Sequence, residues 1–156
     1  ARSTADESAS LVPGDLLALF EGARLLLEDA GYGGSEPWIA DVAAHTLAAT
    51  VIARGHAGGL AQAERVYRNL AGAGGAQPPP LSDYRAGLKL EEWLGFQARF
   101  FLAARAIVDS ERRGAGKSVV KLARQNGGTI TPGALTGRYP VLRTWLADAF
   151  GPEAGL

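Results

Sequence analysis

The chain has 156 residues, of which 47% are hydrophobic and 21% are charged, and its formal net charge is zero. This length and composition are typical of one folded globular domain. The absence of cysteine excludes disulfide bonds, thiolate metal sites and thiol catalysis. No apolar run approaches the roughly 18 residues that a membrane-spanning helix needs, so we expect no membrane insertion.

The residue pattern predicts an all-α protein, a helical bundle of five to seven helices with a polar N-terminal arm and a Gly/Pro-rich hinge. We predict the arm over residues 1–14 and a single helical domain over residues 15–156. The hinge, residues 74–80, joins the two halves of this domain, 15–73 and 81–156. Its three consecutive prolines favour an extended and semi-rigid segment.

Three helices are predicted before the hinge. The first spans residues 15–30, the second has Ser35 as its N-cap and Pro37 in its first turn, and the third spans about residues 60–70. A glycine-rich segment, residues 55–59, ends the second helix. Apolar residues spaced three and four apart give the first helix one apolar face, made of Leu16, Leu19, Phe20, Ala23, Leu26 and Leu27.

The segment after the hinge is also predicted to be helical. A helical turn near residues 82–87 leads into the longest predicted helix, 88–113. Apolar residues cover most of its circumference, so we expect this helix to be the central and most buried element. A further helix spans residues 117–125, Thr131 is the predicted N-cap of the next one, and Pro140 begins the last. No period-two alternation predicts a strand.

Positive charge is concentrated in residues 112–147, which contain seven basic residues and no acidic one. The 111 residues before them contain nine basic and fourteen acidic side chains, a balance of −5. If one helix runs from Arg113 to Arg124, its cations lie within an arc of about 80°. Such a face attracts anions, and phosphate is the commonest of these. The candidate phosphate-binding residues are Arg112, Arg113, Lys117, Lys121, Arg124, Arg138 and Arg143.

Two interpretations of this basic segment stay open. In the first, the cations pair with acidic residues elsewhere on an ordinary solvated surface. Candidate partners are Glu91, Glu92, Asp109 and Glu111. In the second, they contact a phosphate backbone. Because Tyr139 and Trp145 are the only aromatic residues of the segment, stacking on single-stranded bases is not favoured, and a duplex backbone without sequence-specific readout is preferred.

Other chemical motifs are incomplete. Residues 114–118 end like a phosphate-binding loop, but Glu111 replaces its first glycine and the preceding segment is predicted to be helical. Asp41 and His45 are four residues apart, yet two ligands do not make a metal site. Because His45 also lies on an apolar stripe, we expect a satisfied and partly buried histidine. With no catalytic motif in the sequence, we expect no enzyme, no cofactor and no metal site.

A helical chain of this size with a polar arm, a Gly/Pro hinge and a segregated basic segment resembles the major coat proteins of filamentous archaeal double-stranded DNA viruses. The resemblance covers the architecture of the whole chain and no sequence motif. It implies a structural protein of the virion whose paired subunits, copies of itself or of a homologous chain, wrap double-stranded DNA. It also implies that the seven basic residues contact phosphates, together with Arg2 in the arm.

Two alternatives to a coat protein remain. One is a non-enzymatic helical adaptor or accessory subunit, cytoplasmic in location, whose basic face binds an acidic protein partner. The other is a bundle that binds a small ligand or cofactor in a cavity lined by Trp38, Trp93 and phenylalanine side chains. Competition by duplex DNA for the partner site separates the coat-type function from the adaptor function.

Overall fold

A computed structural model describes residues 12–73, 81–84, 87–111 and 114–150. Within these ranges the chain forms seven α-helices and one two-stranded sheet, so the predicted all-α class is confirmed. The predicted hinge at residues 74–80 and residues 1–11 of the predicted arm lie outside the described residues. No helix in the described ranges is both long enough and apolar enough to cross a membrane.

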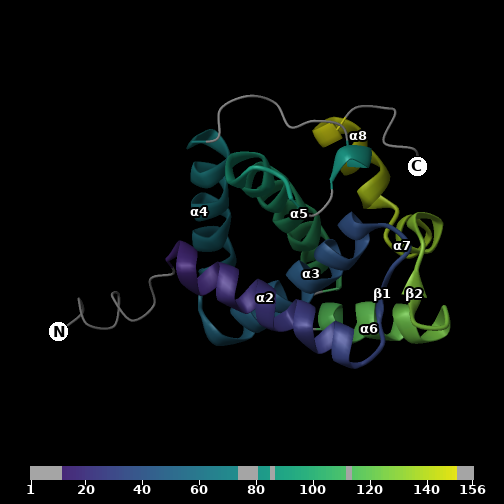
Figure 1. Ribbon diagram of the computed structural model, residues 1–156. Helices are drawn as coiled ribbons and strands as arrows, with labels where there is room; N and C mark the ends of the chain where they lie inside the picture. The colour runs from purple at the N-terminus through teal and green to yellow at the C-terminus, as the bar shows by residue number, and fades with distance from the viewer. Residues whose placement is uncertain (1–11, 74–80, 85–86, 112–113, 151–156) are drawn as a thin grey trace.

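Three helices precede residue 74, as predicted. They are α2 (Pro13–Asp29), α3 (Pro37–Gly55) and α4 (Gly59–Ala73). In Figure 1, α2 runs across the front of the molecule and α4 stands at one side of it. The first of these helices begins two residues before the predicted start, because proline in a first turn already has a helical φ and needs no backbone donor there.

The start of α3 differs from the prediction. Its N-cap is Glu36, whose side chain makes no capping hydrogen bond, so the assignment of Ser35 as the N-cap was wrong. Instead, the backbone N–H of Ser35 donates to the carbonyl of Ile130 at 2.9 Å. This bond holds residue 35 in an extended segment beside the chain that precedes α7 (Pro132–Arg138).

The second part of the chain begins with a short 3-10 turn and continues through four helices. These elements are η1 (Leu81–Asp83), α5 (Leu90–Glu111), α6 (Ala115–Gln125), α7 and α8 (Val141–Phe150). The predicted cap at Thr131 is confirmed, because its Oγ1 accepts a hydrogen bond from the N–H of Ala134 at 3.1 Å. Gly114 is the N-cap of α6, so this helix begins at Ala115, and Arg113 of the predicted continuous helix lies outside the described residues.

Two short parallel strands join segments that are far apart in the sequence. β1 (Gly33–Gly34) follows α2, and β2 (Thr129–Ile130) follows α6, with Gly33 opposite Thr129. The carbonyl of Gly128, which has a φ of 93°, accepts a hydrogen bond from Gly33 at 2.8 Å. No strand was predicted here, because two residues are too few to show an alternating pattern.

Helix α3, and not α5, is the most buried element. In α3, 12 of 19 residues are buried, whereas in α5 nine of 22 are buried. The prediction that residues 88–113 would form the most buried helix was therefore wrong. Many residues of α3 are alanines, whose small side chains let α2, α5 and α6 pack against several sides of the same helix. This packing determines where α2 and α6 lie beside each other around α3.

Candidate functional site

The structure places the seven predicted phosphate-binding residues at different positions. Arg112 and Arg113 lie outside the described residues. Three others are exposed along one face of α6: Lys117, Lys121 and Arg124. Arg143 is exposed on α8, and in Figure 1 the helix α7 lies between α8 and α6. The fold therefore groups the three cations of α6 and leaves Arg143 on another element.

Arg138 on α7 is neutralised by an acidic neighbour. Its Nη2 lies 2.5 Å from Oε1 of Glu111 at the end of α5. Its guanidinium also lies over the ring of Tyr139, with 5.0 Å from Cζ to the ring centroid. Glu111 was one of the acidic residues named as a candidate partner, so the surface ion-pair interpretation is correct for this arginine.

The cations of α6 border an apolar groove between α2, α3 and α6, with a volume of about 700 Å³. The floor of this groove is formed by Leu26, Leu47, Val51 and Val120. Its basic side chains are Arg54, Lys117, Lys121 and Arg124. No acidic side chain is found among the described residues that line it. We call this feature the basic-rimmed groove.

The floor of the basic-rimmed groove is exposed because two apolar side chains point away from the core. Leu26 is 68% exposed and Val51 is 56% exposed. The prediction that Leu26 belongs to the inward apolar face of α2 was wrong. Adjacent residues of a helix point about 100° apart, so the face that α3 covers takes Leu27 and leaves Leu26 outside. The groove also depends on Gly116, where a Cβ atom would lie 3.3 Å from Cδ2 of Leu47.

The sequence did not reveal Arg54 or the apolar floor as parts of one site. Arg54 occupies the last turn of α3, where a cation interacts favourably with the helix dipole, and this alone gives no functional signal. Only the packing of α6 on α3 brings it to the cations of α6. At the other end of the groove, Arg124 Nε donates to the hydroxyl of Tyr32 at 3.3 Å, which orients the guanidinium.

A second polar feature lies inside the core and joins four side chains: Asp41, His45, Tyr84 and Gln97. The amide nitrogen of Gln97 donates to the Tyr84 hydroxyl at 2.5 Å and to Asp41 Oδ2 at 3.3 Å. The Tyr84 hydroxyl in turn donates to Asp41 Oδ2. Because the Gln97 oxygen can only accept, His45 Nε2, which lies 2.7 Å from it, carries the proton.

Burial shifts the titration of this network. It lowers the pKa of His45 to about 4, although the hydrogen bond with Gln97 acts in the opposite direction. It raises the pKa of Asp41, and hydrogen bonds from Tyr84 and Gln97 offset part of that shift. His45 is fully buried and not partly buried as predicted, and its Nδ1 has no hydrogen-bond partner in the described part of the chain.

No protein-family model, curated protein or solved structure matches this chain. The resemblance to viral coat proteins therefore stays a prediction. A fold class alone does not specify a function, so the function must be inferred from the charge, shape and exposure of the sites themselves. Among the described residues, no group of three or more His, Asp or Glu side chains is arranged to hold a metal ion.

Proposed function

We propose that this chain is a non-enzymatic helical adaptor whose basic-rimmed groove binds an acidic amphipathic helix of a partner protein. The observation that carries the proposal is the combination of four basic side chains with an exposed apolar floor. Contiguous apolar surface with a polar rim is typical of an interaction site. Because the described lining residues include four basic and no acidic side chains, a partner with negative charge complements the groove.

A helix fits this surface better than an extended peptide. The groove runs between helices, and none of the described residues that line it belongs to a strand that a peptide could join. An amphipathic helix presents apolar residues at i, i+3, i+4 and i+7, which would cover Leu26 and Val51 together. Carboxylates on the polar face of that helix would then face Arg54 and the cations of α6.

Coating of double-stranded DNA uses the same cations in a different way. A phosphate backbone would pair with Lys117, Lys121 and Arg124, but it has no apolar surface to cover Leu26 and Val51. In addition, Arg138 already pairs with Glu111. The groove therefore favours the adaptor function, and DNA coating becomes the alternative outcome of the same experiment.

The experiment measures binding of two synthetic peptides to the full chain by fluorescence anisotropy. The first is an amphipathic peptide of about 18 residues, or five helical turns, with leucine on one face and glutamate on the other. The second replaces every glutamate with lysine. We expect the acidic peptide to bind and the basic peptide not to bind. Unlabelled duplex DNA of arbitrary sequence serves as the competitor.

Two matched pairs of variants locate the site. Leu26→Gln removes part of the floor, and Leu90→Gln changes a leucine that is equally exposed, at 68%, but lies at the start of α5. Lys121→Gln removes a rim cation, and Lys89→Gln removes an exposed lysine outside the groove. We expect Leu26→Gln and Lys121→Gln to weaken peptide binding by about tenfold, the effect of losing about 1.4 kcal/mol, and the two controls to leave it unchanged.

Three results contradict the adaptor proposal. The first is the absence of binding by the acidic peptide. The second is peptide binding that Leu26→Gln does not weaken. The third is tight binding of duplex DNA that Lys121→Gln weakens and Leu26→Gln does not, with a log–log salt slope of about −0.9 for each phosphate contact. This last result would support the nucleic-acid function instead.

A further inference from the structure

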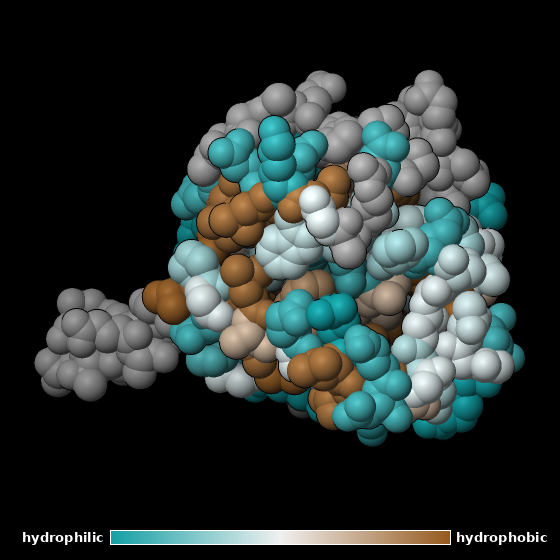
Figure 2. Space-filling model, in the orientation of Figure 1, coloured by the Kyte–Doolittle hydropathy of each residue, from teal (hydrophilic) through white to brown (hydrophobic). Residues whose placement is uncertain are grey.

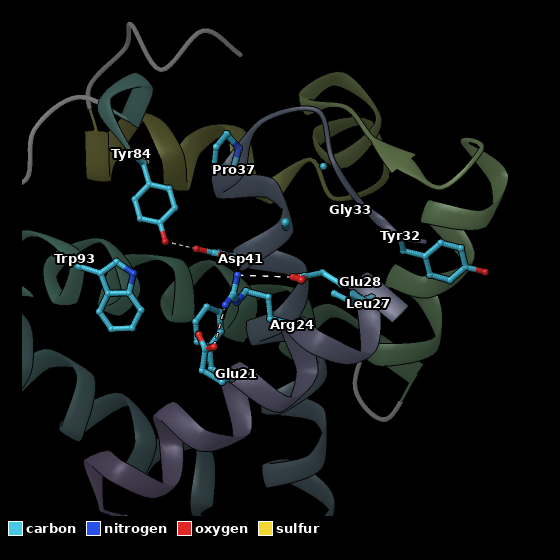
Figure 3. A pocket seen from close by; sticks show the side chains of 13 residues that line it. Glu21, Arg24, Leu27, Glu28, Tyr32, Gly33, Pro37, Asp41, Tyr84 and Trp93 are labelled. Carbon is cyan, nitrogen blue, oxygen red and sulfur yellow. Dashed lines mark hydrogen bonds and ion pairs between the residues drawn. The ribbon is translucent and has the colours of Figure 1, made fainter. Parts of the chain in front are cut away.

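A second cavity, with a volume of about 510 Å³, lies between α2, the start of α3 and the segment that contains η1 and α5. Figure 3 shows this cavity from close by. Four aromatic side chains line it: Phe20, Tyr32, Tyr84 and Trp93. The ligand cavity expected from the sequence was lined by Trp38, Trp93 and phenylalanines. Of these, Trp93 and one phenylalanine, Phe20, line the observed cavity, and Trp38 does not. We call this feature the aromatic cavity.

The charged residues of the aromatic cavity are Glu21, Arg24, Glu28 and Asp41. Three carboxylates therefore face one guanidinium. Figure 2 shows hydrophilic side chains gathered over α2, near the middle of the face that is drawn. The balance of charge among these described residues is −2 when all four are ionised, so the cavity favours a cation over an anion.

Two glutamates hold the single cation of this set. Nη2 of Arg24 lies 3.0 Å from Oε2 of Glu21, and its Nη1 lies 3.9 Å from Oε2 of Glu28. In Figure 3 the guanidinium lies between the two carboxylates, on the side of the cavity where Asp41 projects from α3. Arg24 is thus engaged by its own helix, and its two partners offset its charge.

Asp41 has one carboxylate oxygen in use and one available. Its Oδ2 accepts from Tyr84 and from Gln97, whereas no described residue donates to its Oδ1. The hydroxyl of Tyr84 accepts from Gln97, so its own proton points to Asp41, as an ionised carboxylate requires. Asp41 is only 7% exposed, yet it lines the cavity, and a poorly solvated acceptor gains from a donor that a ligand supplies.

We propose that the aromatic cavity binds a primary ammonium group attached to a small apolar body. The ammonium donates to Oδ1 of Asp41, and this charge-assisted hydrogen bond fixes its position. The apolar body packs against Trp93 and against the part of Phe20 that lines the cavity, and the ring face of Trp93 also attracts a cation. This inference does not rest on the adaptor function, because the basic-rimmed groove lies on the α6 side of α3 and takes a ligand of opposite charge.

Three small molecules of similar size and different charge test the proposal on the full chain by isothermal titration calorimetry. They are 2-phenylethylamine, 2-phenylethanol and 3-phenylpropionate. We expect saturable binding of the amine, binding of the alcohol that is weaker by roughly tenfold or more, and no binding of the acid. The difference between amine and alcohol measures the charged hydrogen bond and not the packing of the ring.

Two variants act in opposite directions. Asp41→Asn keeps the size of the side chain and removes its charge, and we expect it to weaken amine binding by roughly tenfold or more. Asp109→Asn is the matched control, because Asp109 is exposed near the end of α5 and does not line the cavity. Arg24→Gln removes the competing cation, and we expect it to strengthen amine binding.

Arg24→Gln also keeps the test decisive if Asp41→Asn does not fold, because the side chain of Arg24 is 40% exposed and its loss leaves the buried network intact. The proposal is overturned if the amine does not bind, or if amine and alcohol bind equally well. It is also overturned if 3-phenylpropionate binds best and Arg24→Gln abolishes that binding, since Arg24 would then be the ligand-binding group.

Discussion

His45 is enclosed by aromatic rings and has one hydrogen-bond partner. Its ring stacks on Phe20 with 4.2 Å between centroids, and Tyr67 and Phe101 meet it edge to face. Its Nε2 donates to Gln97, and no acceptor in the described residues faces its Nδ1. A second proton would therefore be buried without a partner, which explains why the neutral ring is preferred.

This preference predicts a pH-dependent stability. The pKa of His45 is about 4 in the folded chain and 6.5 without burial, so between these pH values the unfolded chain binds more protons. The contribution of His45 to stability then falls by about 3 kcal/mol as the pH decreases from about 6.5 to 4. We expect urea unfolding at pH 7 and pH 4.5 to show a smaller difference in His45→Gln than in the wild type.

His56 supplies the control for this measurement. It is the only other histidine in the sequence and lies in the connection after α3, outside the buried network. His56→Gln should keep the pH dependence of the wild type. If His45→Gln kept it too, the fall in stability would have to come from the carboxylates, and the burial of a neutral imidazole would not explain it.

Partial burial of His45 was predicted from its place on an apolar stripe, but neither its full burial nor its partners could be predicted. Gln97 is 52 residues away in the sequence and Tyr84 is 13 residues from Gln97, so no helical spacing relates the three. The same holds for Asp41, whose four-residue spacing from His45 gave no sign of its hydrogen bonds with Tyr84 and Gln97. A hydrogen-bond network between separate helices depends on their packing, which periodicity does not specify.

At the scale of the elements, β1 and the first turn of α3 meet where there is no space for a side chain. A Cβ atom on Gly34 would lie 2.5 Å from Cβ of Ile39 and 3.0 Å from the backbone nitrogen of Ala40. A Cβ atom on Gly33 would meet no atom within 4 Å. Two adjacent glycines of the same strand therefore have different structural roles.

This contrast predicts different effects of the same substitution. Gly34→Ala should lower the free energy of unfolding by about 1–3 kcal/mol, because either α3 or β1 must shift. Gly33→Ala should have a much smaller effect, since the added methyl group has space and also restricts the unfolded chain. Urea midpoints of the two variants measure the difference. Equal midpoints would mean that β1 is not held against α3 in solution.

The helices were more predictable than their burial. Proline and glycine positions predicted both ends of α2 and α3, and the start of α7, to within about two residues, because these residues act locally on the backbone. The pairing of β1 with β2 was not predictable, since it relies on backbone groups alone. The greater burial of α3 also escaped prediction, because alanines give a weak apolar signal although they allow close packing.

At the scale of the whole molecule, the two predicted halves share one core. α5 packs against α3 and α4, and α6 packs against α3, so helices from both sides of residues 74–80 are in contact. Arg105 of α5 adds an ion pair to this interface, with its Nη1 2.7 Å from Oε1 of Glu64 on α4. The basic-rimmed groove spans the same division, because its floor and rim come from α2, α3 and α6.

This shared assembly explains why the groove could not be predicted. Four cations were recognisable from their helical spacing, and the three that lie on α6 do share one face. Leu26, Val51 and Arg54 come from the other half of the chain, and nothing in their local sequence relates them to α6. The charge of the site was thus visible in the sequence, whereas the apolar floor that distinguishes a protein partner from DNA was not.

A shared core predicts that the two halves unfold together. Separating them would expose the faces of α3 and α5 that pack on each other, so a state with only one half folded should not be populated.

Tryptophans report on each half: Trp38 is buried in α3, and Trp93 and Trp145 are partly buried in α5 and α8. Replacing Trp38 with phenylalanine leaves only the reporters of the second half, and replacing the other two leaves only the reporter of the first. In each variant, we expect the urea midpoints from tryptophan fluorescence and from far-ultraviolet circular dichroism to coincide. A fluorescence midpoint that differs from the circular dichroism midpoint in either variant would show that residues 15–73 and 81–156 unfold as separate units.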